Sequence, residues 1–155
     1  MTERDQERKV IRDVIHGYIS LSEFDLKIID TENFQRLKRI RQTGAFSVYP
    51  CANHTRFEHS LGVMHLGQQV IQNIRKSLDR ELDDRILDTV KSACLLHDIG
   101  HAPFSHIGES FLNKEEIIEK IKEGLDSREI SNNLILEKAA PHELCSCAIS
   151  IDKYA

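Results

Sequence analysis

The sequence lacks an apolar run that could cross a membrane, and its first residues, MTERDQERKV, lack the apolar core of a secretory signal. A membrane-spanning helix needs roughly 20 consecutive apolar residues. A signal peptide needs a shorter apolar segment behind its charged start. These two absences predict a soluble, cytoplasmic protein without a membrane partner.

Paired cysteines and an excess of basic residues are also missing. The chain has four cysteines, Cys51, Cys94, Cys145 and Cys147, and no two of them form the CxxC pair of a zinc ribbon. We therefore expect reduced thiols that pack in the structure rather than disulfides or zinc ligands. The net charge of −4 argues against a nucleic-acid partner, so a local group of positive side chains would have to meet an anionic substrate.

The apolar residues that are present follow a mainly helical pattern. With 155 residues and 40% hydrophobic content, the chain suits one compact core and is too short for two ordinary domains. Residues 10–21 predict a β-hairpin with Gly17 in its turn, residues 47–53 a short extended segment, and residues 124–128 a loop. Helical spacing predicts two helices over residues 22–44, with Thr31 as N-cap of the second, and further helices over residues 59–78, 82–98, 114–123, 129–138 and 141–151.

The stretch LLHDIGHAPFSH carries the most informative pair of residues, His97 and Asp98. Neighbouring helical residues point about 100° apart, so both can reach one ion only at the end of the helix, where Gly100 frees the backbone. The run HTRFEHSLGV places His59 where an antiparallel helix could bring a third ligand. An isolated histidine is more often structural, but this combination favours a divalent metal ion, Mn, Fe, Zn or Mg.

A protease interpretation of the same stretch fails. His101 lies four residues after His97, which is the HxxxH spacing of a zinc protease. No Glu follows the first histidine, and that Glu is the general base of such enzymes.

Basic residues gather after residue 35. Arg36, Lys38, Arg39 and Arg41, together with Gln35 and Gln42, are expected on one amphipathic helix that could meet a triphosphate. The alternative is a helix face that only meets water, and the residues alone favour neither interpretation.

Six strings occur in one order along the chain: VIRDVIHGYISL, IIDTENFQRLKRIRQTG, VYP, HTRFEHSLGV, HDIGHAPFSH and HEL. In these strings the chain resembles the HD-domain deoxynucleoside triphosphate triphosphohydrolases, especially the branch that includes the animal SAM-and-HD-domain protein. The resemblance implies a mainly α fold, an HD-domain helical bundle with a small N-terminal β-hairpin. It places a flexible N-terminus at residues 1–8 and the N-terminal portion of the HD domain at residues 9–155.

The resemblance implies specific roles for individual residues. The metal ligands would be His59, His97 and Asp98. Substrate would be bound by Arg56, at a phosphate, and by Gln42, on the deoxyribose side. The catalytic residues would be His101, His142 and Glu109, with His142 our choice for the acid that protonates the leaving nucleoside oxygen. A regulatory nucleotide would be bound between subunits by Lys9, Asp30, Gln35 and Lys38.

One expected ligand has no counterpart. The family completes its metal site with an Asp far downstream of the HEL segment, and no such motif occurs before Ala155. We therefore expect a domain that is incomplete at its C-terminus, and a homo-oligomer or a missing C-terminal portion that covers its apolar faces.

The leading hypothesis is a metal-dependent phosphohydrolase that cleaves a dNTP into deoxynucleoside and triphosphate. Two alternatives stay open. One is an HD phosphohydrolase that acts on another nucleotide, because the same metal motif would serve it equally well. The other is a non-catalytic nucleotide-binding or assembly module, because the final Asp ligand is absent.

Overall fold

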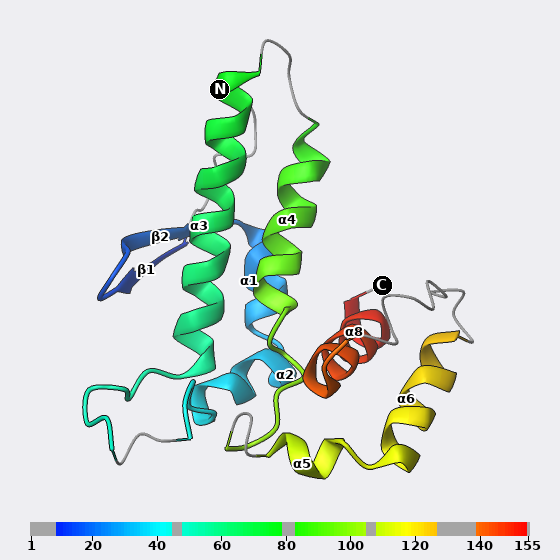
Figure 1. Cartoon of the computed structure of the whole chain (residues 1–155). Coiled ribbons are helices and arrows are strands. Elements are labelled where there is room, and N and C mark those ends of the chain that lie inside the picture. Colours follow the sequence, from blue (N-terminus) through cyan, green and yellow to red (C-terminus); the bar gives the residue numbers. More distant parts are fainter. Residues whose placement is uncertain (1–8, 45–47, 79–82, 105–107, 127–138, 155) are drawn as a thin grey trace.

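The fold is seen in a computed structural model, which describes residues 9–44, 48–78, 83–104, 108–126 and 139–154. The described part is mainly helical with one small two-stranded sheet, as the sequence predicts (Figure 1). The flexible N-terminus expected at residues 1–8 and the helix expected at residues 129–138 lie outside the described residues. No helix in the described ranges is long and apolar enough to cross a membrane.

The described part of the chain begins with the predicted β-hairpin, which consists of β1 (Lys9–Asp13) and the antiparallel β2 (Gly17–Leu21). Gly17 has a φ of +74°, a conformation that side chains disfavour, so glycine suits this turn. An Asp13 carboxylate oxygen accepts the backbone N–H groups of Ile15 and His16, both at 2.8 Å, and closes the turn. The second strand turns Ile19 and Leu21 into the protein core.

Two short helices follow, each started by a side-chain cap. Ser22 and Asp25 form a capping box at α1 (Glu23–Ile29), and Thr31 caps α2 (Glu32–Gln35) as predicted. A 3₁₀ turn, η2 (Arg36–Arg39), continues α2.

The predicted helix to residue 44 is wrong beyond Arg39. Ile40 is extended, and its carbonyl accepts the backbone N–H of Arg56 at 2.8 Å. The Gln42 backbone N–H donates to the His54 carbonyl, so pairing with a distant segment replaces the helix. The extended segment expected at residues 47–53 is a turn over residues 48–51, where Pro50 suits the bend.

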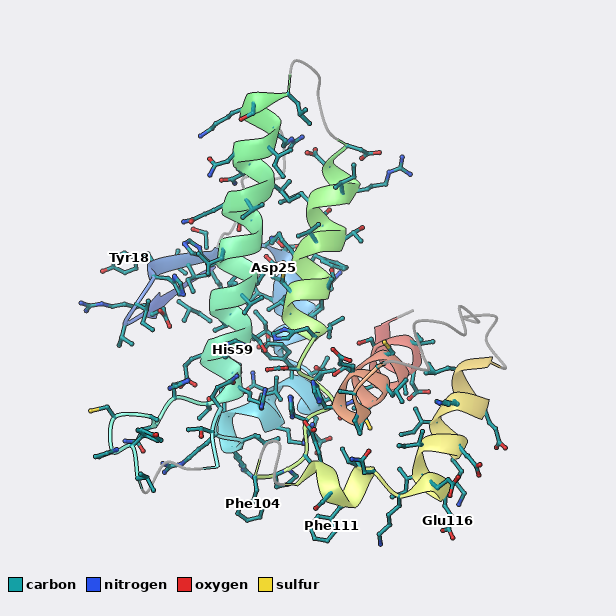
Figure 2. All side chains as sticks on the ribbon, viewed as in Figure 1. Tyr18, Asp25, His59, Phe104, Phe111 and Glu116 are labelled. Atoms are coloured by element: carbon teal, nitrogen blue, oxygen red, sulfur yellow. The ribbon has the colours of Figure 1, made fainter. Side chains whose placement is uncertain are left out.

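The two longest helices, α3 (Arg56–Ser77) and α4 (Asp84–Leu96), run antiparallel and side by side (Figure 1). Lys91 of α4 and Asp25 of α1 form a buried ion pair at 2.5 Å, which ties the N-terminal layer to this helix pair. Asp25 is labelled in Figure 2, behind α3 and α4. The core between these layers consists of Ile19, Leu21, Ile28, Ile29, Phe34, Leu37, Ile40, Phe57, Leu61, Met64, Leu95 and Ile99.

The remaining helices form a C-terminal limb beside this core. They are α5 (Glu109–Leu112), α6 (Glu115–Asp126) and α8 (Pro141–Tyr154), the last beginning at Pro141 as predicted. The loop expected from residue 124 is wrong for residues 124–126, because α6 continues to Asp126 and buries Leu125. Leu144 of α8 is also buried, and α8 packs against both α5 and α6.

Candidate metal centre

The three residues expected to hold a metal meet where α3 begins and α4 ends. His59 lies in the first turns of α3, His97 is the C-cap of α4, and Asp98 follows directly. The two imidazole Nε2 atoms are 3.3 Å apart. An Asp98 carboxylate oxygen lies 3.4 Å from Nε2 of His97, and the other lies 3.6 Å from Nε2 of His59. The sequence expectation that the helix end lets both neighbours face one point agrees with this arrangement.

The hydrogen bond on the far side of His97 fits a metal ligand. Nδ1 of His97 lies 2.8 Å from the Cys94 carbonyl oxygen. A carbonyl can only accept, so this nitrogen carries the hydrogen and leaves a lone pair on Nε2. Metal-binding histidines commonly make such a bond to a carbonyl group. Two imidazole nitrogens and a carboxylate are donors that suit Mn, Fe or Zn.

The charges around the site also favour metal binding. Asp98 is buried, which opposes its ionisation, but neighbouring His97, Arg56 and His101 outweigh burial and lower the pKa of its carboxyl. Arg56 is buried too, and its guanidinium donates to the Asp98 carboxylate at 2.5 Å. Burial lowers the pKa of His59, and the effect of Asp98 in the opposite direction does not cancel it. At neutral pH the site therefore holds a carboxylate and a neutral imidazole, the forms that bind metal ions.

A second cluster shares Asp98 with the first. His101 places Nε2 at 3.4 Å from an Asp98 oxygen, and its ring stacks on the ring of His142 with centroids 3.9 Å apart. Glu109 lies 2.7 Å from Nδ1 of His142 and 3.6 Å from Nδ1 of His101. The three residues come from the segment after α4, from α5 and from the first turn of α8. The structure thus brings together the three residues for which the resemblance implies a catalytic role, and that role stays a prediction.

Two side chains around this site have roles that the sequence interpretation missed: Arg36 was expected only in the basic cluster, and Ser146 was not singled out. Arg36 donates to the carbonyls of Ile99 and His101, at 2.6 and 2.8 Å. The buried Ser146 hydroxyl accepts the N–H of Gly100 at 2.9 Å and donates to the His97 carbonyl at 2.8 Å. One signal for Ser146 was present in the sequence, because it lies four residues after His142, on the same face of a helix.

Glycine at position 100 was expected to free the backbone at the helix end, but the structure gives a different reason for it. A Cβ at this position would lie 2.3 Å from the backbone nitrogen of Ser146 and 2.5 Å from the His142 carbonyl oxygen. Glycine is therefore needed because α8 approaches the backbone closely, and no positive φ is involved.

Of the two residues expected to bind substrate, Arg56 lies at the site and is already engaged there. The Arg56 side chain is only 2% exposed and contacts Asp98, so its expected contact with a phosphate stays a prediction. Gln42 is half-buried directly before the segment that enters α3, and its role also stays a prediction.

The prediction that the basic residues share one face of a single helix is wrong. Arg36 turns towards the carbonyls after α4, the Lys38 ammonium lies 4.6 Å from the centre of the Phe57 ring, and Arg41 lies beyond the helix. Of the expected regulatory residues, Lys9 and Asp30 are exposed on separate elements, while the Gln35 side chain donates to the Ile29 carbonyl at 2.8 Å. Nucleotide binding by these residues stays a prediction.

Comparisons with known proteins show the family of the chain. The model of the HD domain family matches residues 56–149, the span from the start of α3 into α8. The chain is 45% identical over 108 residues to the deoxynucleoside triphosphate triphosphohydrolase SAMHD1 homolog of Dictyostelium discoideum, which covers 68% of this chain and 21% of that protein. It is 46% identical over 101 residues to the human deoxynucleoside triphosphate triphosphohydrolase SAMHD1, covering 64% of this chain and 16% of that protein.

A relative of unassigned function is similar over a stretch of nearly the same length. An uncharacterized protein of Methanocaldococcus jannaschii is 54% identical over 99 residues, which is 63% of this chain and 20% of that protein. The chain therefore spans about a fifth or less of the length of these three relatives.

Proposed function

Because this chain belongs to the HD-domain family, we propose that it is a metal-dependent phosphohydrolase that cleaves a dNTP into a deoxynucleoside and inorganic triphosphate. One observation carries the proposal: two imidazoles and a carboxylate from separate helix ends face one point, at distances of 3.3 to 3.6 Å from one another. The relatives named as dNTP triphosphohydrolases support the choice of a dNTP as the substrate.

His59, His97 and Asp98 are the residues that would hold the ion. A divalent ion bound there would polarise a phosphate oxygen and lower the pKa of a water molecule. The side chains of His59 and His97 are 33% and 36% exposed, so the group is open to solvent on one side. Substrate and water would enter from that side.

The second cluster supplies the proton that the reaction needs. Breaking the bond to the α-phosphate leaves a nucleoside 5′-oxygen, which has to be protonated. Glu109 lies 2.7 Å from Nδ1 of His142, on one side of the ring, so Nε2 on the other side is the nitrogen that would serve as the proton donor. His101 is buried between Asp98 and His142, where its role is to hold the second imidazole in place or to contact the phosphate.

The test is product analysis with matched variants. The chain loaded with Mn²⁺ is incubated with each dNTP, and the products are separated by ion-exchange chromatography. Release of deoxynucleoside and intact triphosphate, lost in His97→Ala and Asp98→Ala, would support the proposal. Stepwise release of orthophosphate would instead indicate a phosphohydrolase of another type. Binding of dNTP without turnover would indicate a nucleotide-binding module.

Assembly is a separate part of the proposal. We expect a homo-oligomer or a further portion of protein to cover the exposed apolar residues of the helix pair, among them Leu66, Val70 and Ile74. Light scattering of the purified chain over a range of concentrations measures this directly.

A further inference from the structure

We propose that Arg36 and Ser146 are positioning residues, which hold the backbone of residues 97–101 so that His97, Asp98 and His101 face their shared centre. The inference deepens the proposed function and rests on it. It concerns two side chains that touch none of the expected ligand atoms and act only on the backbone between them.

Positioning residues are needed here because the segment follows the C-terminal end of α4. The last carbonyls of a helix have no partner inside it, and a buried carbonyl without a partner is costly. The residues from Asp98 to His101 are buried, so water cannot easily donate hydrogen bonds to their carbonyls. The carbonyls of His97, Ile99 and His101 are instead met by side chains from distant segments.

Arg36 suits this task because its guanidinium is a rigid fork. Its two terminal nitrogens reach two carbonyls that flank Gly100, at 2.6 and 2.8 Å. A lysine ammonium is a single point of charge and cannot reproduce the planar pair of donors. Burial lowers the pKa of Arg36, against an opposing effect of Cys145, so the group is desolvated where it makes these bonds.

Ser146 holds the same backbone from α8. Its hydroxyl accepts from Gly100 and donates to the His97 carbonyl, so one oxygen joins two points of the loop. The close approach that requires Gly100 brings α8 near enough for these bonds. Arg36 and Ser146 belong to elements on either side of the helix pair in the sequence, and each fixes the segment independently.

The experiment measures Co²⁺ binding to the full chain, by visible absorption and calorimetric titration, in Arg36→Lys and Ser146→Ala. Outer partners of metal ligands typically contribute about 10- to 100-fold to affinity, and we expect a loss in that range for each variant, with altered Co²⁺ absorption bands. Arg39→Lys and Ser150→Ala are the matched controls. Arg39 is exposed in the same turn, and Ser150 bonds only within α8 through its hydroxyl, to the Ser146 carbonyl. We expect both controls to bind Co²⁺ as the unchanged chain does.

A rescue experiment separates positioning from general damage. In Arg36→Ala, added guanidinium should restore part of the Co²⁺ affinity, while methylammonium at equal concentration should not. Wild-type affinity and unchanged absorption bands in both Arg36→Lys and Ser146→Ala would overturn the inference. Loss of affinity in the two controls as well would also overturn it.

Failure of the proposed function would look different. If the unchanged chain binds no Co²⁺, the metal site is refuted, and the positioning role is judged from hydrogen exchange alone. Ser146→Ala should then speed amide exchange at Gly100 relative to amides in the middle of α3. Unchanged exchange at Gly100 would refute the role of Ser146 in holding this segment.

Discussion

The α3 and α4 helices are packed unevenly along their length. At the end that carries the candidate site, α3 buries Arg56, Phe57, Ser60, Leu61 and Met64. Beyond Met64 no residue of α3 is buried, and three apolar residues, Leu66, Val70 and Ile74, are 48%, 55% and 40% exposed. On α4, Ile86 at the far end is exposed, while Leu95 next to the site is fully buried.

This difference shows where precise packing matters in the molecule. Asp98 and its charged neighbour Arg56 are buried among side chains that can hardly move, since close-packed interiors leave few voids. The distal end has no comparable cover within the described residues. We therefore expect substitutions at the site end to change both stability and metal binding, and substitutions at the distal end to change little.

Asp98→Ala should show the largest effect. The substitution removes the carboxylate that both histidine clusters share and breaks the buried ion pair with the Arg56 guanidinium. Loss of one partner of a buried ion pair costs about 3–5 kcal/mol, so urea denaturation should show a much lower free energy of unfolding. Mn²⁺ binding should be lost in calorimetric titration. Asp88→Ala, at an exposed position of α4, should match the unchanged chain in both measurements.

His142→Ala tests whether chemistry and metal binding are separate at the site end. General acid catalysis contributes about 10²- to 10⁴-fold, so kcat for dNTP hydrolysis should fall in that range while Mn²⁺ affinity stays the same. Glu109→Gln should act in the same direction with a smaller effect, because the ring keeps a hydrogen-bonding neighbour. A parallel loss of Mn²⁺ affinity in His142→Ala would contradict the division of roles.

Leu61→Ala and Ile74→Ala compare the two ends of α3 directly. Leu61 is 2% exposed within the core, and its truncation should lower the free energy of unfolding by about 2–5 kcal/mol. Ile74 is 40% exposed, and its truncation should change stability by less than about 0.5 kcal/mol. Equal losses in denaturant titrations would mean that the distal end is covered in solution.

The pH dependence of metal binding depends on the lowered pKa of His59. The neutral ring binds the ion, so Mn²⁺ affinity should be constant above the ordinary histidine pKa of about 6.5. As the pH falls through the lowered pKa, protonation competes, and affinity should drop by about tenfold per unit for one proton. Titrations at a series of pH values check the onset, and an onset well above pH 6.5 would contradict the role of burial.

Asp84→Ala should have the smallest effect. Asp84 pairs with Arg75 at 2.8 Å where the distal ends of α3 and α4 meet, and its side chain is 56% exposed. Exposed ion pairs contribute about 0.2–1 kcal/mol, and added salt should erase most of the difference. A loss close to that of Leu61→Ala would refute the contrast between the two ends.

The residues that carry local signals predicted much of this fold. The hairpin around Gly17, the cap at Thr31 and the two long helices agree with the sequence, because turn geometry, capping and periodicity act over a few residues. His59, His97 and Asp98 were also grouped correctly in space, since an antiparallel helix pair leaves few alternatives.

The parts that the sequence could not predict depend on distant contacts. Arg36 meets carbonyls 63 and 65 residues further along the chain, and no local pattern separates it from the exposed Arg39 beside it. The helix expected to reach residue 44 ends early because Ile40 pairs with Arg56. Helical propensity was overruled in this segment by a tertiary contact.

Asp25 shows how closely the N-terminal layer and the site are linked. Its carboxylate accepts the backbone N–H of Ser22 at the start of α1 and also the ammonium of Lys91 in α4. In place of Asp25, asparagine would preserve the cap but leave the buried Lys91 ammonium without a negative charge beside it. Glutamate would preserve the charge, but its longer side chain would have to fit where Asp25 is only 1% exposed. Lys91 lies within about two helical turns of His97. An inherited substitution of Asp25, although remote from the histidines in the sequence, would therefore disturb the helix that carries His97.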